Sequence, residues 1–346
     1  MARVSDRELA YINRWQRNFP LVERPFAASG QEVGWSEEET LAALRGMSER
    51  GIISRIGAVV RPNTVGASTL AALSAPAERL DEVARIVSDQ PEVTHNYERD
   101  HELNLWFVVT AADRAAVLAA LARIRKLTGL EVLDLPMVRA HHIDLGFALP
   151  RAGARGDRGG KVVSPCVAAH PAAGGGAECS PFARQLLAAI EDGLPLVERP
   201  YAEVGRRLGV SAAVVMETLD GLGRNGVISR FGLVVHHREL GFSANAMVVW
   251  DFPGEVMEKA AAIIAGEDRV TLCYERPRRL PRWRYNLFCM IHGSSREEVL
   301  AVVDKLAEKL RRDTGLGEVA HEALFSLRRF KQCGARFSAG LKKGAA

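Results

Sequence analysis

The sequence predicts an α+β fold built as a tandem repeat, in which each copy is a winged helix-turn-helix followed by a ferredoxin-like (βαββαβ) domain. The repeat can be seen directly, because Pro20–Ala27 (PLVERPFA) returns as Pro195–Ala202 (PLVERPYA). The same shift carries Gly51–Gly57 (GIISRIG) onto Gly226–Gly232 (GVISRFG) without a gap. Apolar periodicity then gives the same order of helices and strands in both copies.

Three helices and a strand open each copy. In the first copy, Ser5 caps a helix to about Arg17, Pro25–Gln31 forms a short helix, and Ser36 with Glu39 makes a capping box for a helix ending at Gly51. Ile52–Val60 follows as a β-wing. The second copy repeats this pattern at Pro181–Ile190, at Tyr201–Leu208 and in a helix that Ser211 caps and that runs to Asn225. Three short helices and a wing are typical of a winged helix-turn-helix.

The remainder of each copy predicts the β-α-β-β-α-β order of a ferredoxin-like domain. In the first copy the segments are Ala67–Ser74, Ala77–Ser88, Val93–Arg99, Leu103–Thr110, Ala115–Lys126 and Val132–Ile143. In the second they are Ala244–Asp251, Gly254–Ala265, Val270–Glu275, Tyr285–His292, Arg296–Arg311 and Val319–Phe330.

These elements divide the chain into four domains and a linker. The heads are predicted at residues 1–66 and 181–241, and the ferredoxin-like domains at 67–149 and 242–338. Residues 150–180 are rich in Gly, Ala and Pro without apolar periodicity, which predicts a flexible linker. A duplicated chain most simply buries its exposed faces by pairing its two halves around a pseudo-twofold axis, and a site between them can be asymmetric.

Composition excludes several classes of function. Lys and Arg (46) barely exceed Asp and Glu (42), so any anionic partner must be met by a local cluster of basic residues. The charged N-terminus and the lack of a long apolar stretch predict a cytoplasmic protein with no membrane span. The five cysteines form no CxxC pair, which argues against zinc and iron–sulfur sites and favours free thiols.

The combination of a winged helix and a ferredoxin-like domain resembles the Lrp/AsnC transcriptional regulators across nearly all of each copy. A recognition helix must meet phosphates with Lys or Arg. The third helix of the first copy instead begins with Ser36–Glu39 (SEEE), and its counterpart offers Arg224 as its only base. DNA binding is therefore the alternative and not the leading hypothesis, with a haem sensor of the same fold beside it.

Within that superfamily, three blocks of the first copy resemble one subunit type of siroheme decarboxylase: His95-Asn96-Tyr97-x-Arg99, Asn104–Phe107 and His142–Phe147. The second copy, with Cys273-Tyr274-x-Arg276, Asn286-Leu287 and Arg329–Lys331, resembles the partner type. The fused pair is similar to the decarboxylase of haem d1 biosynthesis, and the resemblance covers both repeats but not the linker.

This resemblance implies a carboxy-lyase that removes the C12 and C18 acetate carboxylates of siroheme, giving 12,18-didecarboxysiroheme and two CO₂. It implies siroheme as the ligand and no cofactor beyond that iron tetrapyrrole, whose macrocycle can act as the electron sink. It leaves open a homo-oligomer or an assembly with related decarboxylase subunits. A pocket for siroheme needs arginines for carboxylates, flat apolar or aromatic walls, and an acid that replaces the lost CO₂ with a proton.

Histidines are the first candidates for the chemistry. The resemblance favours His95 as an axial ligand of the substrate iron or as a proton donor, and His142 as a general acid near a reacting acetate. The alternative is that each histidine only hydrogen-bonds a backbone group at the end of a strand. His141 precedes His142 on a strand, so it points to the opposite face and ranks as a substrate-binding residue.

Tyrosine and arginine recur at one place in both copies, as Tyr97 with Arg99 and as Tyr274 with Arg276. This recurrence indicates a phenol against the macrocycle and a guanidinium for a carboxylate. Tyr97 and Arg99 are assigned to catalysis, and Tyr274 and Arg276 to substrate binding. The alternative is a core tyrosine beside an arginine on a solvated edge.

The remaining candidates are basic residues that occur in the second copy alone. Arg278 and Arg279 belong to a run of five arginines from Arg276 to Arg284, in an insertion that could hold acetates and propionates or simply be solvated. Arg329 and Lys331 stand where the first copy ends in histidines. His236 and His237 replace Arg61 and Pro62, and they are candidates for binding carboxylates or iron, unless they are exposed loop residues.

Overall fold

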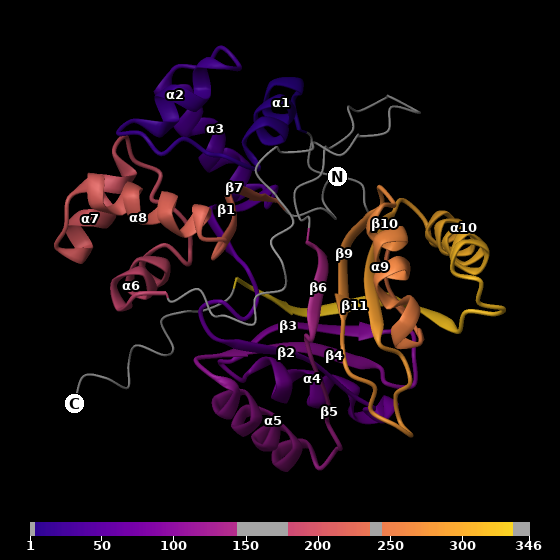
Figure 1. Cartoon of the computed structure of the whole chain (residues 1–346). Coiled ribbons are helices and arrows are strands. Elements are labelled where there is room, and N and C mark those ends of the chain that lie inside the picture. Colours follow the sequence, from indigo (N-terminus) through magenta and orange to yellow (C-terminus); the bar gives the residue numbers. More distant parts are fainter. Residues whose placement is uncertain (1–3, 144–178, 236–243, 335–346) are drawn as a thin grey trace.

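The computed structural model describes residues 4–143, 179–235 and 244–334. Its mixed α+β architecture confirms the predicted fold class, with two helical heads and two ferredoxin-like domains (Figure 1). The predictions for His236, for His237 and for most of the linker lie outside the described residues.

Each head is a bundle of three helices followed by one strand. The first comprises α1 (Asp6–Trp15), α2 (Pro25–Gln31), α3 (Glu37–Glu49) and β1 (Ile53–Val60). The second comprises α6 (Pro181–Ala189), α7 (Pro200–Leu208), α8 (Ala212–Arg224) and β7 (Ile228–Val235). Ser5, Ser36 and Ser211 cap their helices by accepting a backbone N–H, as the sequence predicts, and Ser180 does the same for α6.

The predicted wing has a different use in the structure. β1 pairs antiparallel with β7 of the other copy, with Gly57 opposite Gly232, so the strands join the two heads (Figure 1). One hydrophobic core, which includes Trp15, Phe26, Leu186 and Tyr201, runs through both heads. The heads therefore form a single body, and the interface between the copies starts here.

The ferredoxin-like domains share a nine-stranded sheet in the order β5-β2-β4-β3-β11-β8-β10-β9-β6. The first copy supplies β2 (Ala67–Leu73), α4 (Leu80–Ser88), β3 (Val93–Arg99), β4 (Leu105–Ala111), α5 (Arg114–Thr128), β5 (Leu133–Pro136) and β6 (Arg139–Ile143). The second supplies β8 (Ala244–Trp250), α9 (Met257–Ala265), β9 (Val270–Glu275), β10 (Leu287–Gly293), α10 (Arg296–Thr314) and β11 (His321–Gln332). Short 3₁₀ turns, η1 (Ala77–Arg79) and η3 (Gly254–Val256), precede α4 and α9.

The two copies exchange the ends of their last strands. The segment predicted as one closing strand, Val132–Ile143, divides into β5, which pairs with β2 of its own copy, and β6, which pairs with β9 of the other copy. The continuous β11 does the equivalent: His321–Phe325 pairs with β8, and Ser326–Gln332 pairs with β3 of the first copy. The prediction of Val132–Ile143 as a single strand is therefore wrong, and each copy's part of the sheet is completed by a strand of the other copy.

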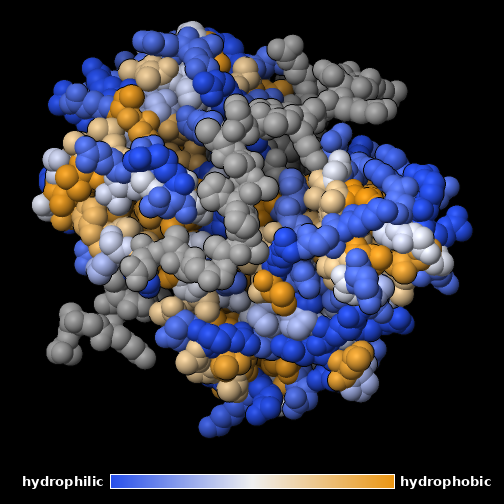
Figure 2. All heavy atoms as spheres, viewed as in Figure 1, coloured by the Kyte–Doolittle hydropathy of each residue, from blue (hydrophilic) through white to orange (hydrophobic). Residues whose placement is uncertain are grey.

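Helices cover the outer sides of this arrangement, with α4 and α5 against β2–β4 and with α9 and α10 against β8–β10 (Figure 1). A separate hydrophobic core contains residues of both copies, including Trp106, Trp283, Tyr285 and Phe288, and lies between the two halves of the sheet. Hydrophilic residues cover much of the surface visible over α10, and apolar residues show over α7 and α8 (Figure 2). No helix among the described residues is long and apolar enough to cross a membrane.

The retained asparagines Asn104 and Asn286 fix the ends of β2 and β8. The amide of Asn104 accepts from the Ala75 N–H (2.9 Å) and donates to the Ala75 carbonyl (2.9 Å). Asn286 makes the same pair of bonds with Phe252, both at 2.9 Å. These residues of the repeat are thus structural clamps, because each satisfies the buried backbone groups of a strand end.

Candidate functional site

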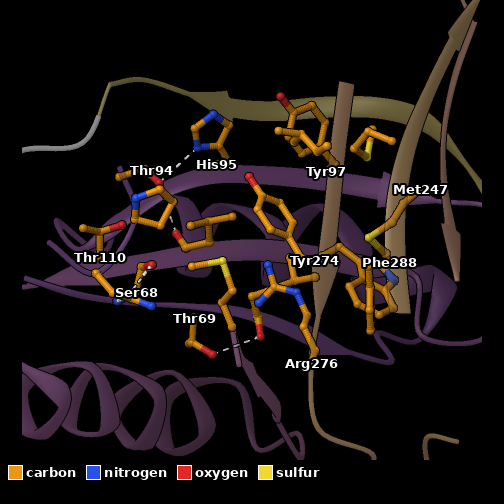
Figure 3. Close-up of a pocket in the computed structure, with 18 of the residues that line it drawn as sticks. Ser68, Thr69, Thr94, His95, Tyr97, Thr110, Met247, Tyr274, Arg276 and Phe288 are labelled. Carbon is orange, nitrogen blue, oxygen red and sulfur yellow. Dashed lines mark hydrogen bonds between the residues drawn. The ribbon is translucent and has the colours of Figure 1, made fainter. Parts of the chain in front are cut away.

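A cavity of ≈ 460 Å³ lies between the two halves of the sheet. Strands β2, β3 and β4 of the first copy line one side, together with the end of β11 that pairs with β3, and β8, β9 and β10 line the other (Figure 3). The segment 60–66, which connects the first head to its sheet, completes the wall. The expected site between the copies is therefore present as a cavity to which both contribute.

Apolar and aromatic residues line the cavity in pairs that the repeat relates. Trp106 of β4 corresponds to Phe288 of β10, and Leu70 of β2 corresponds to Met247 of β8. Trp106 and Phe288 are almost completely buried. Flat aromatic walls of this kind suit a planar ligand by burial and by stacking.

Tyr97 and Tyr274 project into the same space from β3 and β9, with Arg276 below Tyr274 (Figure 3). Burial raises the pKa of Tyr274 to about 12, so its phenol stays protonated at neutral pH. Each tyrosine also lies near the arginine two residues later, with 5.9 Å from the Tyr97 ring centroid to Arg99 Cζ and 5.5 Å from Tyr274 to Arg276. The predicted position of both phenols against a ligand is compatible with this geometry.

Arg99 and Arg276 line the cavity and also connect the copies. Arg99 Nη1 donates to the carbonyl of Leu324 (2.8 Å), which belongs to the second copy, and Arg276 Nη1 donates to the carbonyl of Leu135 (2.5 Å), which belongs to the first. The two carbonyls lie at equivalent places, in the strands whose ends are exchanged. Burial lowers the pKa of Arg276 to about 10, so the side chain remains a cation at pH 7.

Two further arginines, Arg61 and Arg329, belong to the lining, and no Asp or Glu occurs among the described residues that form it. Arg329 of β11 lies opposite Tyr97 in register, is exposed, and donates from Nη1 to Gln332 Oε1 (3.1 Å). The cavity therefore concentrates positive charge in a chain whose acids and bases nearly balance. Four guanidiniums around one cavity favour a ligand with several carboxylates.

Each copy places one imidazole in the cavity. His95 Nδ1 lies 3.0 Å from Thr94 Oγ1, and His292 Nε2 lies 3.1 Å from Thr271 Oγ1, the threonine that the repeat relates to Thr94. Burial lowers the pKa of His95 to about 4. Burial, with a contribution from the Arg99 guanidinium, also lowers the pKa of His292 to about 4. Both imidazoles are consequently neutral at pH 7 and able to offer a lone pair or an N–H.

His292 and Arg61 were not identified as site residues from the sequence. The repeat aligns His292 with Thr110, so no shared motif marks it. Its position was still predictable in part, because alternation on a strand through Phe288 and Met290 places His292 on the same face.

His141 and His142 lie on β6 and are not among the described residues that line the cavity. A bulge between Ala140 and His142 interrupts the predicted period-2 pattern, and His142 falls opposite Cys273, which is buried toward α9. His141 Nε2 lies 3.7 Å from Glu275 Oε2. Burial and the Arg139 charge lower the pKa of His141, against the opposing effect of Glu275.

Arginines of the arginine-rich insertion form hydrogen bonds with other groups of the protein. Arg278 donates to Asp251 (Nε to Oδ1, 2.9 Å), and Arg279 Nε donates to the Asp134 carbonyl (2.8 Å). Between them and the next strand, Trp283 packs against Trp106 with a centroid separation of 5.1 Å. The insertion thus fixes the sheets to each other, and Arg278 and Arg279 do not line the cavity.

Lys331 also lies outside the lining of the cavity. Its ammonium donates to the carbonyls of Ser88 (2.6 Å), the last residue of α4, and Gln90 (3.1 Å), which follows it. Among the described residues, no group of three or more His, Cys, Asp or Glu side chains is arranged to hold a metal ion.

Together, the fold and the cavity define a fused pair of ligand-binding domains around a shared, positively charged site. The family model for the AsnC-like ligand binding domain matches residues 65–142 and 239–331. The model for the siroheme decarboxylase NirDL-like HTH domain matches residues 8–53 and 183–228.

The relatives narrow the class. The siroheme decarboxylase NirDL subunit of Paracoccus denitrificans (strain Pd 1222) is 43% identical over 334 residues, which is 96% of this chain and 97% of that protein. The siroheme decarboxylase of Hydrogenobacter thermophilus (strain DSM 6534 / IAM 12695 / TK-6) is 33% identical over 322 residues, 92% of this chain and 90% of that one. The chain belongs to the siroheme decarboxylase family.

Solved structures agree with this assignment. The crystal structure of the siroheme decarboxylase NirDL superposes with a TM-score of 0.67 at 28% identity and covers 96% of this chain and 94% of that one. The same type of protein in co-complex with an iron-uroporphyrin III analogue gives a TM-score of 0.65 at 29% identity, over 96% of this chain and 93% of that one.

Proposed function

We propose that this protein decarboxylates siroheme, removing the C12 and C18 acetate carboxylates as CO₂ to give 12,18-didecarboxysiroheme. The observation that carries the proposal is the composition of the cavity: four arginines, two neutral imidazoles and aromatic walls, with no carboxylate among the described lining residues. Siroheme is a flat macrocycle with eight carboxylates, so this composition is complementary to it. The relatives named as siroheme decarboxylases match nearly the whole chain.

The chemistry requires a proton for each acetate. When CO₂ leaves, the electron pair of the broken C–C bond stays on the side-chain carbon and is shared with the macrocycle until a proton arrives there. The pKa values of His95 and His292 make both imidazoles neutral at pH 7, but the negative charge of bound carboxylates favours their protonated forms. The substrate thus raises the pKa of the groups that deliver the protons.

The proposed roles follow from position. His95 acts as axial ligand of the substrate iron or as proton donor, and His292 provides the second imidazole. Tyr97 and Tyr274 hold the macrocycle, and Arg99, Arg276 and Arg329 neutralise its carboxylates. His142 as a general acid lacks support from the geometry, since it is not in the lining.

A transcriptional regulator is the function that the heads alone would suggest. β1 and β7, the strands that would serve as wings, pair with each other, and α3 begins with three glutamates, of which Glu37 pairs with Arg24. An acidic helix N-terminus repels phosphate. The heads therefore support the enzyme and do not favour DNA binding.

Separate relatives also bear on assembly. The siroheme decarboxylase NirL and NirD subunits of Stutzerimonas stutzeri are 45% and 51% identical over 161 and 138 residues, which is 46% and 40% of this chain. We propose that the two fused copies do within one chain what such subunits do together, through the exchanged strands β6 and β11.

Anaerobic incubation with siroheme tests the reaction directly. Mass spectrometry should show successive loss of two CO₂ units, and a His95→Ala/His292→Ala variant should not convert siroheme. General acid–base groups typically contribute about 10²–10⁴-fold to rate, so single variants should fall within that range. Unchanged siroheme after prolonged incubation with the wild-type protein would refute the assignment.

A further inference from the structure

We propose that Arg61, which lies in the segment that connects the first head to its sheet, binds one carboxylate of the tetrapyrrole, so that the helix-turn-helix heads take part in substrate recognition. The proposal rests on the proposed function, because it assigns a residue to the same substrate. It gives the heads a use that their fold does not reveal.

A rigid turn holds Arg61 at the edge of the cavity. Its carbonyl accepts from Thr64 N (3.3 Å) and Thr64 Oγ1 (2.7 Å), and Asn63 Oδ1 accepts from Ser68 N (3.0 Å). Gly66 closes the turn against Ala111, where a Cβ would come within 2.4 Å of the carbonyl oxygen. The segment between β1 and β2 is thus fixed at both ends, and Arg61 is held in a defined position at the edge of the cavity.

One donor of the Arg61 side chain, Nε, is buried without a hydrogen-bond partner among the described residues. The residue nevertheless lines the cavity. The end of its guanidinium lies beside Gly226 of the second head, where an added Cβ would be 3.9 Å from Nη2. A buried guanidinium donor without a partner is costly, and a carboxylate is the group that satisfies Nε and Nη together.

The surroundings make a substrate carboxylate the fitting partner. The described lining contains no Asp or Glu that could pair with Arg61. Arg99 and Arg276 each already donate to a backbone carbonyl, so Arg61 adds an anchor on the side of the heads. The ligand class is a flat macrocycle with acetate or propionate groups along its rim.

Arg61 also connects this anchor to the pairing of the heads. Its backbone N–H donates to the carbonyl of Val227 in the second head (2.8 Å), directly before β7. A carboxylate bound to the side chain is therefore held by a residue that spans both copies. Binding of the substrate should stabilise the paired heads, because a ligand stabilises the state that binds it.

The test compares Arg61→Gln and Arg61→Lys with Arg184→Gln. Arg184 of α6 donates to Val65 of the same turn (3.3 Å) but does not line the cavity, so its variant reports on loosening of the turn alone. The probes are iron uroporphyrin III, with eight carboxylates, and protohaem, with two, titrated by absorbance in the full chain.

Arg61→Gln should weaken binding of iron uroporphyrin III about tenfold or more and change protohaem binding less than threefold, because a charge-assisted hydrogen bond to a peripheral carboxylate is lost. Arg61→Lys should recover only part of the lost affinity for iron uroporphyrin III, since an ammonium cannot replace the planar donor pair of the guanidinium. Equal losses for both porphyrins, an equal loss in Arg184→Gln, or no loss at all would overturn the role of Arg61. Wild-type protein that binds siroheme without converting it would instead refute the proposed function and leave this comparison valid.

Discussion

The two half-buried imidazoles of the cavity should make the stability of this protein depend on pH in a specific way. His95 and His292 each have a pKa of about 4 in the folded state, against about 6.5 in an unfolded chain. Between these values the unfolded state binds more protons, so stability rises with pH and falls as pH decreases toward the folded pKa. The contribution is fully present above the unfolded pKa and is lost on acidification.

The size of the effect follows from the shift. A difference of about 2.5 pKa units corresponds to about 3 kcal/mol per histidine below pH 4, at 1.36 kcal/mol per unit. Between pH 7 and pH 5 each histidine should cost about 2 kcal/mol, and the pair about 4 kcal/mol, which is a large part of the stability of an ordinary domain.

Urea denaturation of the wild type and of a His95→Asn/His292→Asn variant at pH 7 and pH 5 measures this directly. Carboxylates with lowered pKa values, such as Glu8 and Asp251, reduce the free energy of unfolding on acidification by the same amount in both proteins, so their contribution cancels in the comparison. The wild type should lose about 4 kcal/mol more than the variant over this interval. Parallel losses in the two proteins would show that the imidazoles are not buried as neutral groups.

Three further predictions concern the heads and the connection between the copies. Gly232→Ala should destabilise the paired heads by about 1–3 kcal/mol in thermal unfolding, because its Cβ would lie 2.4 Å from the Trp15 carbonyl oxygen. Gly57→Ala should be tolerated, because no atom lies nearer than 3.6 Å to its Cβ. Equal effects of the two substitutions would contradict this packing. Arg276→Met should lower the free energy of unfolding in chemical denaturation by about 1–3 kcal/mol, because the buried Leu135 carbonyl loses its donor. An unchanged denaturation midpoint would contradict the role of this arginine in connecting the two copies. In a gel shift at low salt we expect no sequence-specific DNA complex, and a discrete, salt-sensitive footprint would restore the regulator hypothesis.

Local sequence signals predicted the elements but not their partners. Capping at Ser36 and the apolar period of the strands depend on neighbouring residues, and the structure reproduces both. Exchange of the strand ends could not be predicted, because the hydrogen bonds of β6 with β9 depend on the arrangement of two copies and not on the pattern within Val132–Ile143. The bulge at Ala140 has the same origin, and it placed His142 differently from the period-2 expectation.

The candidate site was predictable where a motif survived in both copies or matched a family. His95, Tyr97 and Tyr274 line the cavity, as expected for residues near a ligand. Charge runs were less informative, because a cluster of arginines does not show whether acids and carbonyls elsewhere in the fold will take its donors. Asp251 takes those of Arg278 in this way.

Residues retained in both copies and residues that differ between the copies have different physical roles. The retained PLVERP motifs form reciprocal ion pairs across the interface, Arg24 with Glu198 (3.2 Å) and Arg199 with Glu23 (3.1 Å). The retained arginines of the sheets likewise bond to the opposite copy. Exposed ion pairs contribute little energy, so their value lies mainly in fixing the register of one copy against the other.

The imidazoles, by contrast, occupy positions that the repeat does not relate: His95 corresponds to Leu272, and His292 corresponds to Thr110. A strictly symmetric cavity would bind a macrocycle equally well in two orientations related by the pseudo-twofold axis. Since the two sides present different groups at these places, the two orientations differ in energy and in the proton donors that they meet. The retained residues thus build the cavity, and we expect divergence at a few positions within it to give a bound macrocycle one preferred orientation.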